Sequence, residues 1–556
     1  MSESSVSEVK PTEKKTGAAA LDDIFQPFNR SDAPGLVVGV AQHGKTLYRR
    51  AFGLASVELG VANTPWTRMR IGSTSKQFTC LAALLLAEEG KLDLDVSARI
   101  YLPELPALKG EPTLRQFMSH TGGYRCYLDA GFMAEGVAIK PKGVALAVQV
   151  RQREVNFAPG EKMIYNNGGY HMLSLVIERV SGMPFESFLK ERIFTPLGMV
   201  DTESVPSDFI ITRGIAALHV PLPDGSLRRG IFPTEEVRGE GAMVSTIDDM
   251  LRWLAHLRGP KTVGSDKTWQ QMTTRARLNN GTVNPYALGL MLHPYRGVDV
   301  IHHGGGVIGG TCQMITVPSA GLDIIIIANG IPASPGELAN KVIDALLDDG
   351  TLGEVETRAE TARFKPMIAA RYHAPASGLT IGFGDAAGKF GLMLYNMGPT
   401  PLRDEGDSLR MGFEDAAVGP FVFSTKEFAT EGATPPASLQ VIEAGHVHRL
   451  ERLPEAAPAL SEAGAALVGR YRAPDLDADA RIAFEGDVLK LEIFGKWGVN
   501  ELVLEAFSAD VFGLKMNLAF APLGAALNVE RKEGRVTALR VNTWRTRQMM
   551  FERVGD

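Results

Sequence analysis

Ser73 and Lys76 form a Ser-x-x-Lys quartet directly in front of a long apolar stretch with helical character, residues 78–89. Residues three apart share one face of a helix, so the Ser73 hydroxyl and the Lys76 amine are expected side by side. A serine becomes a good nucleophile when a neighbouring base takes its proton, and a lysine removed from water becomes such a base. The same spacing occurs at residues 7–10 and 187–190, so other residues must decide which quartet is catalytic.

A second candidate group is Tyr165-Asn166-Asn167, in a predicted loop ahead of a helical stretch that begins at His171. A phenol serves as an acid or a base where nearby cations lower its pKa. The Asn167 amide has the groups to hold Lys76 or a substrate amide. Functional side chains often lie on loops, although these residues taken alone also fit an ordinary turn.

The third candidate group is the His-Gly-Gly-Gly run at residues 303–306, which we place between two predicted strands. Glycine lets a backbone approach a ligand closely, so Gly305 and Gly306 are candidate substrate-binding residues. The N–H groups of Gly306 and Ser73 are candidate donors to an oxyanion. His303 is a candidate donor to a substrate carbonyl, or a group that keeps the tyrosine or the lysine in its working protonation state.

The remaining histidines and cysteines suggest no further chemistry. His120 and His302 also stand two residues before a glycine, but lone histidines are more often structural, and we interpret both in that way. Cys80, Cys126 and Cys312 lie far apart without a C-x-x-C spacing. We expect them to be buried small apolar side chains, and we expect neither a metal nor a cofactor.

These groups need a scaffold, and strand and helix patterns on both sides provide one. Residues 35–41 and 46–53 flank a His-Gly-Lys turn and are typical of a β-hairpin. The pattern from residue 78 to about 199 is mainly helical. Strand patterns return later and end in a helix over 336–347; they cover residues 286–293, 298–302, 312–317 and 322–328. Strands at both ends with helices between predict an α+β domain over residues 21–355.

The rest of the chain has a different character. After a predicted linker at residues 358–366, short strands and glycine-containing turns continue to the end. The hexapeptide at residues 370–375 is weakly repeated at 469–474, and each copy is followed by strand-like segments. We therefore predict two small antiparallel β-barrel domains, residues 366–455 and 464–556.

Composition restricts the function classes. The 556 residues carry a net charge of −6 and no strong basic patch, so nucleic acid is not expected as a partner. Residues 1–20 are polar and lack the apolar core of a signal peptide, so we predict a disordered arm. The apolar run 322–328 is too short to cross a bilayer. We expect a cytoplasmic protein without membrane contact.

The order Ser-x-x-Lys, Tyr-x-Asn, His-x-Gly resembles the serine β-lactamase/penicillin-binding-protein superfamily, in which the serine of the first motif is acylated. A His-x-Gly triplet in place of Lys-Thr-Gly is similar to its class C-like esterase and D-peptidase branch. Supporting stretches lie at residues 113–123, 157–160, 196–199 and 241–246. The resemblance covers roughly residues 20–350. It implies a class C β-lactamase-like domain, and inhibition by β-lactams through slow acylation rather than their hydrolysis.

A class C-like domain followed by two β-barrels is similar to the D-stereospecific aminopeptidases. In that family an acidic residue on a loop of the last barrel binds the α-ammonium group of the substrate. The matching loop here is about residues 494–501, with Glu501 as the nearest acidic candidate and Asn500 beside it. The resemblance also implies a homodimer.

We therefore expect a serine hydrolase that forms an acyl-enzyme and releases N-terminal residues, above all D-residues, from short peptides, amides or esters. Ser73 is the nucleophile, with Lys76 and Tyr165 as proton-transfer groups, Asn167 and His303 as supporting groups, and a small peptide or amide as substrate. Three alternatives stay open. They are a peptidase for linear non-ribosomal peptides such as linearised microcystin, a broad carboxylesterase, and a non-catalytic peptide-binding module.

Overall fold

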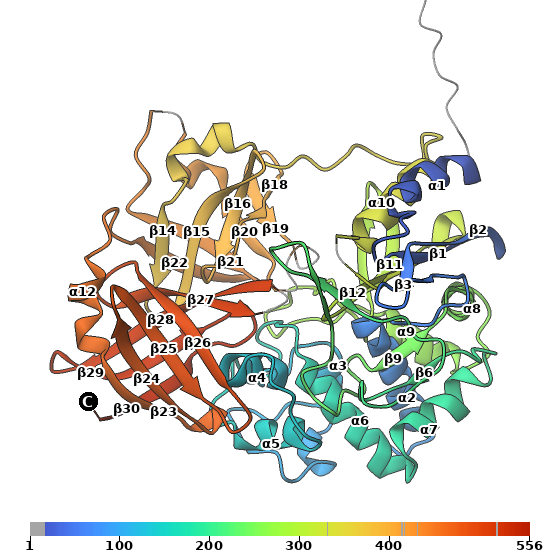
Figure 1. Cartoon of the computed structure of the whole chain (residues 1–556), viewed down its shortest axis with the longest axis horizontal. Coiled ribbons are helices and arrows are strands. Elements are labelled where there is room, and N and C mark those ends of the chain that lie inside the picture. The colour runs from blue at the N-terminus through green and yellow to red at the C-terminus, as the bar shows by residue number, and fades with distance from the viewer. Residues whose placement is uncertain are drawn as a thin grey trace, which may run out of the picture.

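The computed structural model describes residues 17–330, 332–412, 415, 418–430, 432–518 and 521–555. Most of the predicted disordered arm therefore lies outside the described residues, while residues 18–20 open helix α1 (Ala18–Phe25). Figure 1 shows a part rich in helices on the right and two β-sheet units on the left.

The first part is built on a six-stranded antiparallel sheet that joins the two ends of this region, as the sequence predicted. Its strands are hydrogen-bonded in the order β10 (Met291–Tyr295), β11 (Val298–Val307), β12 (Gly310–Val317), β13 (Leu322–Ala328), β1 (Leu36–Gln42) and β2 (Lys45–Phe52). The predicted hairpin is thus β1 and β2. It reaches the late strands because β1 also pairs with β13, with Val38 opposite Ile326.

Helices cover both faces of this sheet. Side chains alternate between faces along a strand, so Ile325 packs into one apolar core and Ile324 into another. The first core also holds α2 (Lys76–Glu88), α6 (Asn167–Ser181) and α8 (Ile247–Arg258). The second holds α1 and α10 (Pro335–Leu346). Buried on all sides along most of its length, α2 is the central helix of the first core, and its first residue is Lys76.

Smaller helices complete this part. They are α3 (Leu114–Met118), α4 (Tyr127–Glu135), α5 (Val144–Arg151), α7 (Phe185–Leu189) and α9 (Asp266–Thr273). A three-stranded sheet of β5 (Met69–Arg70), β9 (Met243–Ser245) and β6 (Glu203–Ser204) lies next to the segment that carries Ser73. Short strand pairs link β3 (Leu54–Ser56) with β4 (Val61–Ala62), and β7 (His219–Pro221) with β8 (Leu227–Arg229).

Two predicted strand ends are wrong. His303 and the three glycines that follow it do not lie between strands but continue β11, because the backbone needs no side chain to pair with β12. Residues 286–290, predicted as strand, form a turn in which Gly289 has a positive φ of 75°. A Cβ on Gly289 would lie 2.8 Å from the Gln77 backbone, so only glycine fits against the first turn of α2.

The predicted β-rich second part consists of two sheets. The first has nine strands in the order β17 (Thr400–Pro401), β16 (Lys389–Leu394), β15 (Leu379–Ala386), β14 (Arg371–Ala374), β22 (His446–Arg452), β21 (Ser438–Glu443), β20 (Phe421–Ser424), β19 (Ser408–Met411) and β18 (Arg403–Asp404). The predicted linker at 358–366 is wrong, because Phe364 is buried in the core of this sheet.

The second sheet is a closed barrel of β23 (Gly469–Ala473), β24 (Ala478–Glu485), β25 (Val488–Phe494), β26 (Val499–Ala506), β27 (Val511–Leu518), β28 (Ala521–Lys532), β29 (Arg535–Asn542) and β30 (Met549–Gly555). The repeated hexapeptides begin the two sheets, with Tyr372 on β14 and Tyr471 on β23 both fully buried. Helix α4 lies against the barrel in Figure 1, and Met133 shares the barrel's apolar core. The fold class predicted from the sequence, an α+β domain followed by two barrel-like β-domains, is confirmed.

Candidate active site

Ser73 lies on a 3₁₀ turn, Gly72–Ser75, that leads directly into α2. In a 3₁₀ helix, side chains three residues apart eclipse each other, which brings Lys76 Nζ to 3.0 Å from Ser73 Oγ. The hydroxyl and the amine are therefore adjacent, as predicted. They lie on a 3₁₀ turn, which is tighter than the α-helical turn that we expected. The quartet at 187–190 ends at an exposed Lys190, and the one at 7–10 lies outside the described residues.

Three oxygen atoms surround the amine of Lys76. Besides Ser73 Oγ, they are Asn167 Oδ1 at 2.8 Å and the main-chain oxygen of Glu240 at 2.6 Å. Carbonyl oxygens only accept hydrogen bonds, so these two take the two N–H bonds of a neutral amine. The remaining lone pair is then available to the Ser73 hydroxyl, which can donate to it. This geometry is that of a general base next to a nucleophile.

The surroundings of Lys76 also favour the neutral amine. The side chain is fully buried, and burial lowers its pKa from the ordinary 10.5 to about 7. The charge of Glu240 acts against this change, and the charge of Arg545 acts with it. A substantial fraction of the molecules therefore carries a neutral Lys76 at neutral pH.

Tyr165 stands beside the same two groups. Its ring lies 4.8 Å from Lys76 Nζ, and it makes a hydrogen bond with Ser73. Burial raises the pKa of Tyr165, while the Ser73 hydrogen bond and the Arg545 charge act against the rise. The phenol is consequently protonated near neutral pH, and in the resting site it is an acid rather than a base.

The loop geometry explains how Tyr165 and Asn167 reach the site. Asn166 caps α6, since its side chain accepts a hydrogen bond from the Gly168 N–H at 2.7 Å. Asn167 is thereby the first residue of α6, facing Lys76. Tyr165 precedes the cap and packs against the His120 ring, with centroids 4.1 Å apart.

The glycines of β11 allow the strand to pass very close to the nucleophile. A Cβ on Gly305 would lie 1.8 Å from the main-chain oxygen of Ile71, so no other residue fits there. A Cβ on Gly72 would lie 2.8 Å from the Gly306 nitrogen, which places the Gly306 backbone against the residue that precedes Ser73. Gly306 itself has open space on its Cβ side and lines the pocket over Ser73.

His303 lies behind the site. Its Nε2 is 2.8 Å from the Tyr286 hydroxyl, and its Nδ1 is 2.6 Å from the Gly304 oxygen. Burial lowers the pKa of His303 to about 3, with the charge of Lys76 acting in the same direction, so the ring is neutral. Of the other histidines, His120 accepts from the Asn166 N–H at 3.0 Å, and His302 contacts Gln313 and His293.

A pocket of about 250 Å³ opens over Ser73. Its polar lining includes Ser73, Asn167, Glu240, Gly306 and Arg545. Its apolar lining consists of Leu128, Phe132, Phe232, Pro233, Val237, Val307 and Ile308. A mostly apolar pocket with a few polar groups at the nucleophile suits a small organic substrate.

Two charged residues of this pocket were missed from the sequence. Glu240 is buried, and its Oε1 is 3.0 Å from His171 Nδ1 and hydrogen-bonded to the Tyr127 hydroxyl. Although burial raises the pKa of Glu240, His171 and Tyr127 lower it overall, so Glu240 is anionic. Arg545 comes from the barrel, more than 370 residues beyond Tyr165, and no spacing rule links them.

The structure does not bring the two barrel residues predicted to bind substrate into this pocket. The Asn500 amide donates to the main-chain oxygens of Phe132 and Met133, at 3.0 and 2.9 Å, and so fastens β26 to α4. Glu501 points outward from the barrel, half exposed, and pairs with Lys490 at 3.0 Å. Neighbouring residues of a strand point to opposite sides, which accounts for the two different fates.

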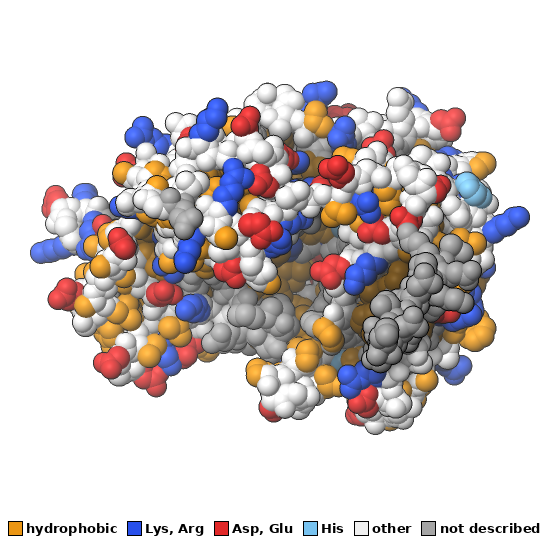
Figure 2. All heavy atoms as spheres, turned by 90° about the horizontal axis from the view of Figure 1, so that it is seen from above, with side chains coloured by type: hydrophobic (Ala, Val, Ile, Leu, Met, Phe, Trp, Pro, Cys, Tyr) orange, Lys and Arg blue, Asp and Glu red, His pale blue; other side chains and the backbone are white. Residues whose placement is uncertain are grey.

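Within the part of the chain that the structure describes, no three His, Cys, Asp or Glu side chains gather as metal ligands. No described helix is both long and apolar enough to cross a bilayer. The three cysteines are buried and unbridged, as predicted. On the face shown in Figure 2, acidic and basic side chains are interspersed rather than gathered in one patch.

Known proteins resemble the chain over most of its length. The D-aminopeptidase of Gluconobacter oxydans (strain 621H) is 29% identical over 543 residues, which cover 94% of this chain and 97% of that protein. The octameric penicillin-binding protein homologue from Pyrococcus abyssi has a TM-score of 0.53 at 18% identity, covering 96% of this chain and 99% of that one. For the D-amino acid amidase from Ochrobactrum anthropi SV3 complexed with D-phenylalanine, the TM-score is 0.51 at 23% identity, over 60% and 99% of the two chains.

The family model described as Beta-lactamase matches residues 21–348, more than half of the chain. The resemblance inferred from the three motifs is thereby confirmed, and the chain belongs to the beta-lactamase family.

Proposed function

We propose that this protein is a serine hydrolase that works through an acyl-enzyme and releases N-terminal amino acids, chiefly D-residues, from short peptides, amides and esters. The observation that carries the proposal is the buried amine of Lys76, which lies 3.0 Å from Ser73 Oγ and contacts two carbonyl oxygens besides. The D-preference is supported by the relatives named D-aminopeptidase, which align over nearly the whole chain.

The reaction uses groups that already touch one another. Lys76 takes the Ser73 hydroxyl proton as Oγ attacks the substrate carbonyl, and the oxyanion accepts hydrogen bonds from the N–H groups of Ser73 and Gly306. The C–N bond then breaks, the leaving amine takes the Tyr165 phenol proton, and Tyr165 regains a proton from Lys76. Water attacks the acyl-enzyme, with Lys76 again as base, and frees the acid and Ser73.

Recognition of an N-terminal ammonium group requires negative charge at the pocket. Among the described residues that line it, Glu240 is the acidic one. Its carboxylate is already hydrogen-bonded to Tyr127 and His171 and is 2% exposed, so we assign it an attraction through space rather than a direct contact. Such attraction is strong where water is excluded.

The test compares D-Ala-p-nitroanilide with its L-isomer and with N-acetyl-D-Ala-p-nitroanilide. We expect the free-amine D-substrate to be cleaved far faster than the other two. Ser73→Ala should lower kcat by about 10⁴- to 10⁶-fold. Ser187→Ala is the matched control, since it removes a serine from the quartet at 187–190, on α7, and should leave kcat unchanged.

Near-normal turnover by Ser73→Ala would overturn the mechanism. Cleavage of p-nitrophenyl esters without cleavage of any D-aminoacyl substrate would keep the acyl-enzyme and replace the aminopeptidase by a carboxylesterase.

A further inference from the structure

The turn between β29 and β30, residues 543–548, projects from the barrel and reaches the pocket over Ser73. Arg545 is the residue that lines the pocket. Its guanidinium carbon lies 4.9 Å from the Tyr165 ring centroid and 4.2 Å from that of Trp544. The barrel thus contributes a cation directly beside the proposed proton donor.

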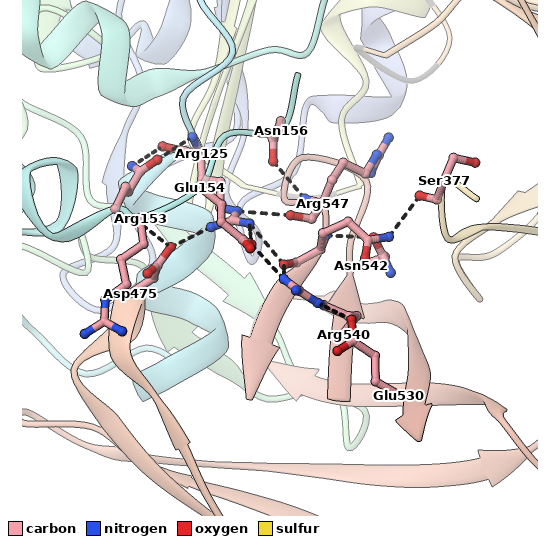
Figure 3. Close-up of polar contacts among 12 residues, drawn as sticks. Arg125, Arg153, Glu154, Asn156, Ser377, Asp475, Glu530, Arg540, Asn542 and Arg547 are labelled. Carbon is pink, nitrogen blue, oxygen red and sulfur yellow. Dashed lines mark hydrogen bonds and ion pairs between the residues drawn. The ribbon is translucent and has the colours of Figure 1, made fainter. Parts of the chain in front are cut away.

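This turn is fastened to the first part of the chain at several points, some of which Figure 3 shows. Asn156 binds it twice, donating to the Arg545 main-chain oxygen and accepting from the Arg547 N–H, both at 2.8 Å. Thr543 Oγ1 donates to Asp129 at 2.7 Å. The position of Arg545 is therefore set by the catalytic part as well as by the barrel.

A buried ion-pair network stands behind the turn. Arg125, 1% exposed, donates to the main-chain oxygens of Arg547 and Gln548, both at 3.0 Å. The same guanidinium pairs with Asp475 of the barrel at 2.6 Å and with Glu154 at 3.1 Å. Figure 3 shows these side chains converging from both parts of the molecule. Burying these charges costs free energy of folding, and the buried pairs fix the position of the turn that carries Arg545.

The charge of Arg545 is not compensated. Within the described residues, its guanidinium makes no hydrogen bond and no ion pair; Nε is buried without a partner, and the two rings are its neighbours. A guanidinium stacked between rings is held flat, with its N–H edge available to a ligand. Planar forks of this kind bind carboxylates with two parallel hydrogen bonds.

We propose that Arg545 binds a carboxylate on the leaving group of the substrate. The inference rests on the proposed function and narrows it: the preferred substrates are short peptides with a free C-terminal carboxylate rather than simple amides. Arg125 is the positioning residue for this contact.

The position of Tyr165 indicates that Arg545 lies on the leaving-group side of the pocket. Tyr165 gives its proton to the leaving amine, and Arg545 lies over the ring of Tyr165. In a dipeptide the terminal carboxylate is only two bonds from that amine nitrogen, so a group beside the proton donor is within its reach. The same pocket is lined by the acidic Glu240, so its charges are suited to a small zwitterion.

The test measures binding, so that it does not depend on turnover. Ser73→Ala enzyme is titrated calorimetrically with D-Ala-Gly and with D-Ala-Gly amide, which differ only in the C-terminal charge. The acid is expected to bind on the order of 10- to 100-fold more tightly, as for a hydrogen bond to a charged group. Adding Arg545→Gln should remove this difference by weakening the acid alone, and Arg545→Lys should retain part of it.

Arg535→Gln is the matched control, because it removes the same charge from an exposed position of β29 and should leave both dissociation constants unchanged. Unchanged binding of the amide by Arg545→Gln shows that the pocket is intact. Equal binding of acid and amide, binding of neither, or a difference that survives Arg545→Gln would each overturn the proposal. Failure of the unsubstituted enzyme to hydrolyse D-aminoacyl substrates, with the acid–amide contrast intact, would refute the proposed function alone.

Discussion

The pH dependence of acylation tests whether Lys76 is the base. A base works only when neutral, and burial lowers the pKa of Lys76 to about 7. Below that pH, kcat/KM should fall about tenfold per pH unit, and above it a plateau is expected. With the ordinary pKa of 10.5, fewer than about one molecule in 10³ would carry the neutral amine at pH 7. The burial of this side chain therefore raises the fraction of enzyme with a neutral Lys76 at neutral pH by about three orders of magnitude.

Two substitutions should move this acidic limb in opposite directions. The charge of Glu240 raises the pKa of Lys76, so Glu240→Gln should shift the limb to lower pH. The charge of Arg545 lowers the same pKa, so Arg545→Gln should shift it to higher pH. Loss of structure would not produce shifts of opposite sign, which separates an electrostatic effect from general damage.

The assay uses p-nitrophenyl acetate, which carries no ionisable group, so the profile of kcat/KM reports groups of the free enzyme. Lys76→Arg is a useful companion variant because arginine keeps its proton at every accessible pH and should leave no active plateau. An acidic limb near pH 10 in the unsubstituted enzyme, or a profile that is flat from pH 5 to 9, would refute the assignment of Lys76 as the base.

Four further substitutions test other parts of the site. Tyr165→Phe should lower kcat for D-Ala-Gly by about 10²- to 10⁴-fold, and have much less effect on p-nitrophenyl acetate, whose leaving group needs no proton; an equal loss on both substrates would contradict the acid role. Gly305→Ala should lower both kcat and the melting temperature, because its Cβ would lie 1.8 Å from a main-chain oxygen, whereas Gly306→Ala has open space and should melt like the unsubstituted protein. Arg125→Met leaves Asp475 unpaired and should cost about 3–5 kcal/mol by chemical unfolding; as a positioning residue, it should also reduce the preference for D-Ala-Gly over the amide, and an unchanged preference would contradict that role.

The part of the site that could be predicted from the sequence is the part that local spacing determines. Ser73 and Lys76 share one turn, so their contact requires only a helix-like segment. Tyr165 and Asn167 lie on either side of Asn166, the residue that caps α6. The glycines at 303–306 were identified as a place of close approach, although their strand was not. The clash that excludes a side chain at Gly305 involves a distant backbone and cannot be deduced from a run of glycines.

The charged residues of the pocket could not be predicted from local spacing. Glu240 stands in a Gly-Glu-Gly tripeptide with no helical or strand period around it. The loop at 494–501 was selected by resemblance, yet its side chains are used to hold the barrel on α4 or remain in solvent. The resemblance predicted that the last barrel approaches the active site, and Arg545 of this barrel lines the pocket over Ser73. Sequence reasoning could not tell which of the turns of a closed barrel faces inward, because that depends on how the barrel docks.

The way the barrel packs against the catalytic part determines the position of Arg545. In the sequence it is one of two basic residues in a short polar turn, and composition would assign it to solvent. Its place over Tyr165 exists only because Arg125 and Asn156, more than 380 residues earlier, hold the backbone of the same turn. The barrel and the catalytic part therefore form one functional unit, and a barrel that shifted on α4 would remove the cation from the pocket while leaving Ser73 and Lys76 in contact. Such a molecule would keep its acylation chemistry and lose its discrimination among substrates.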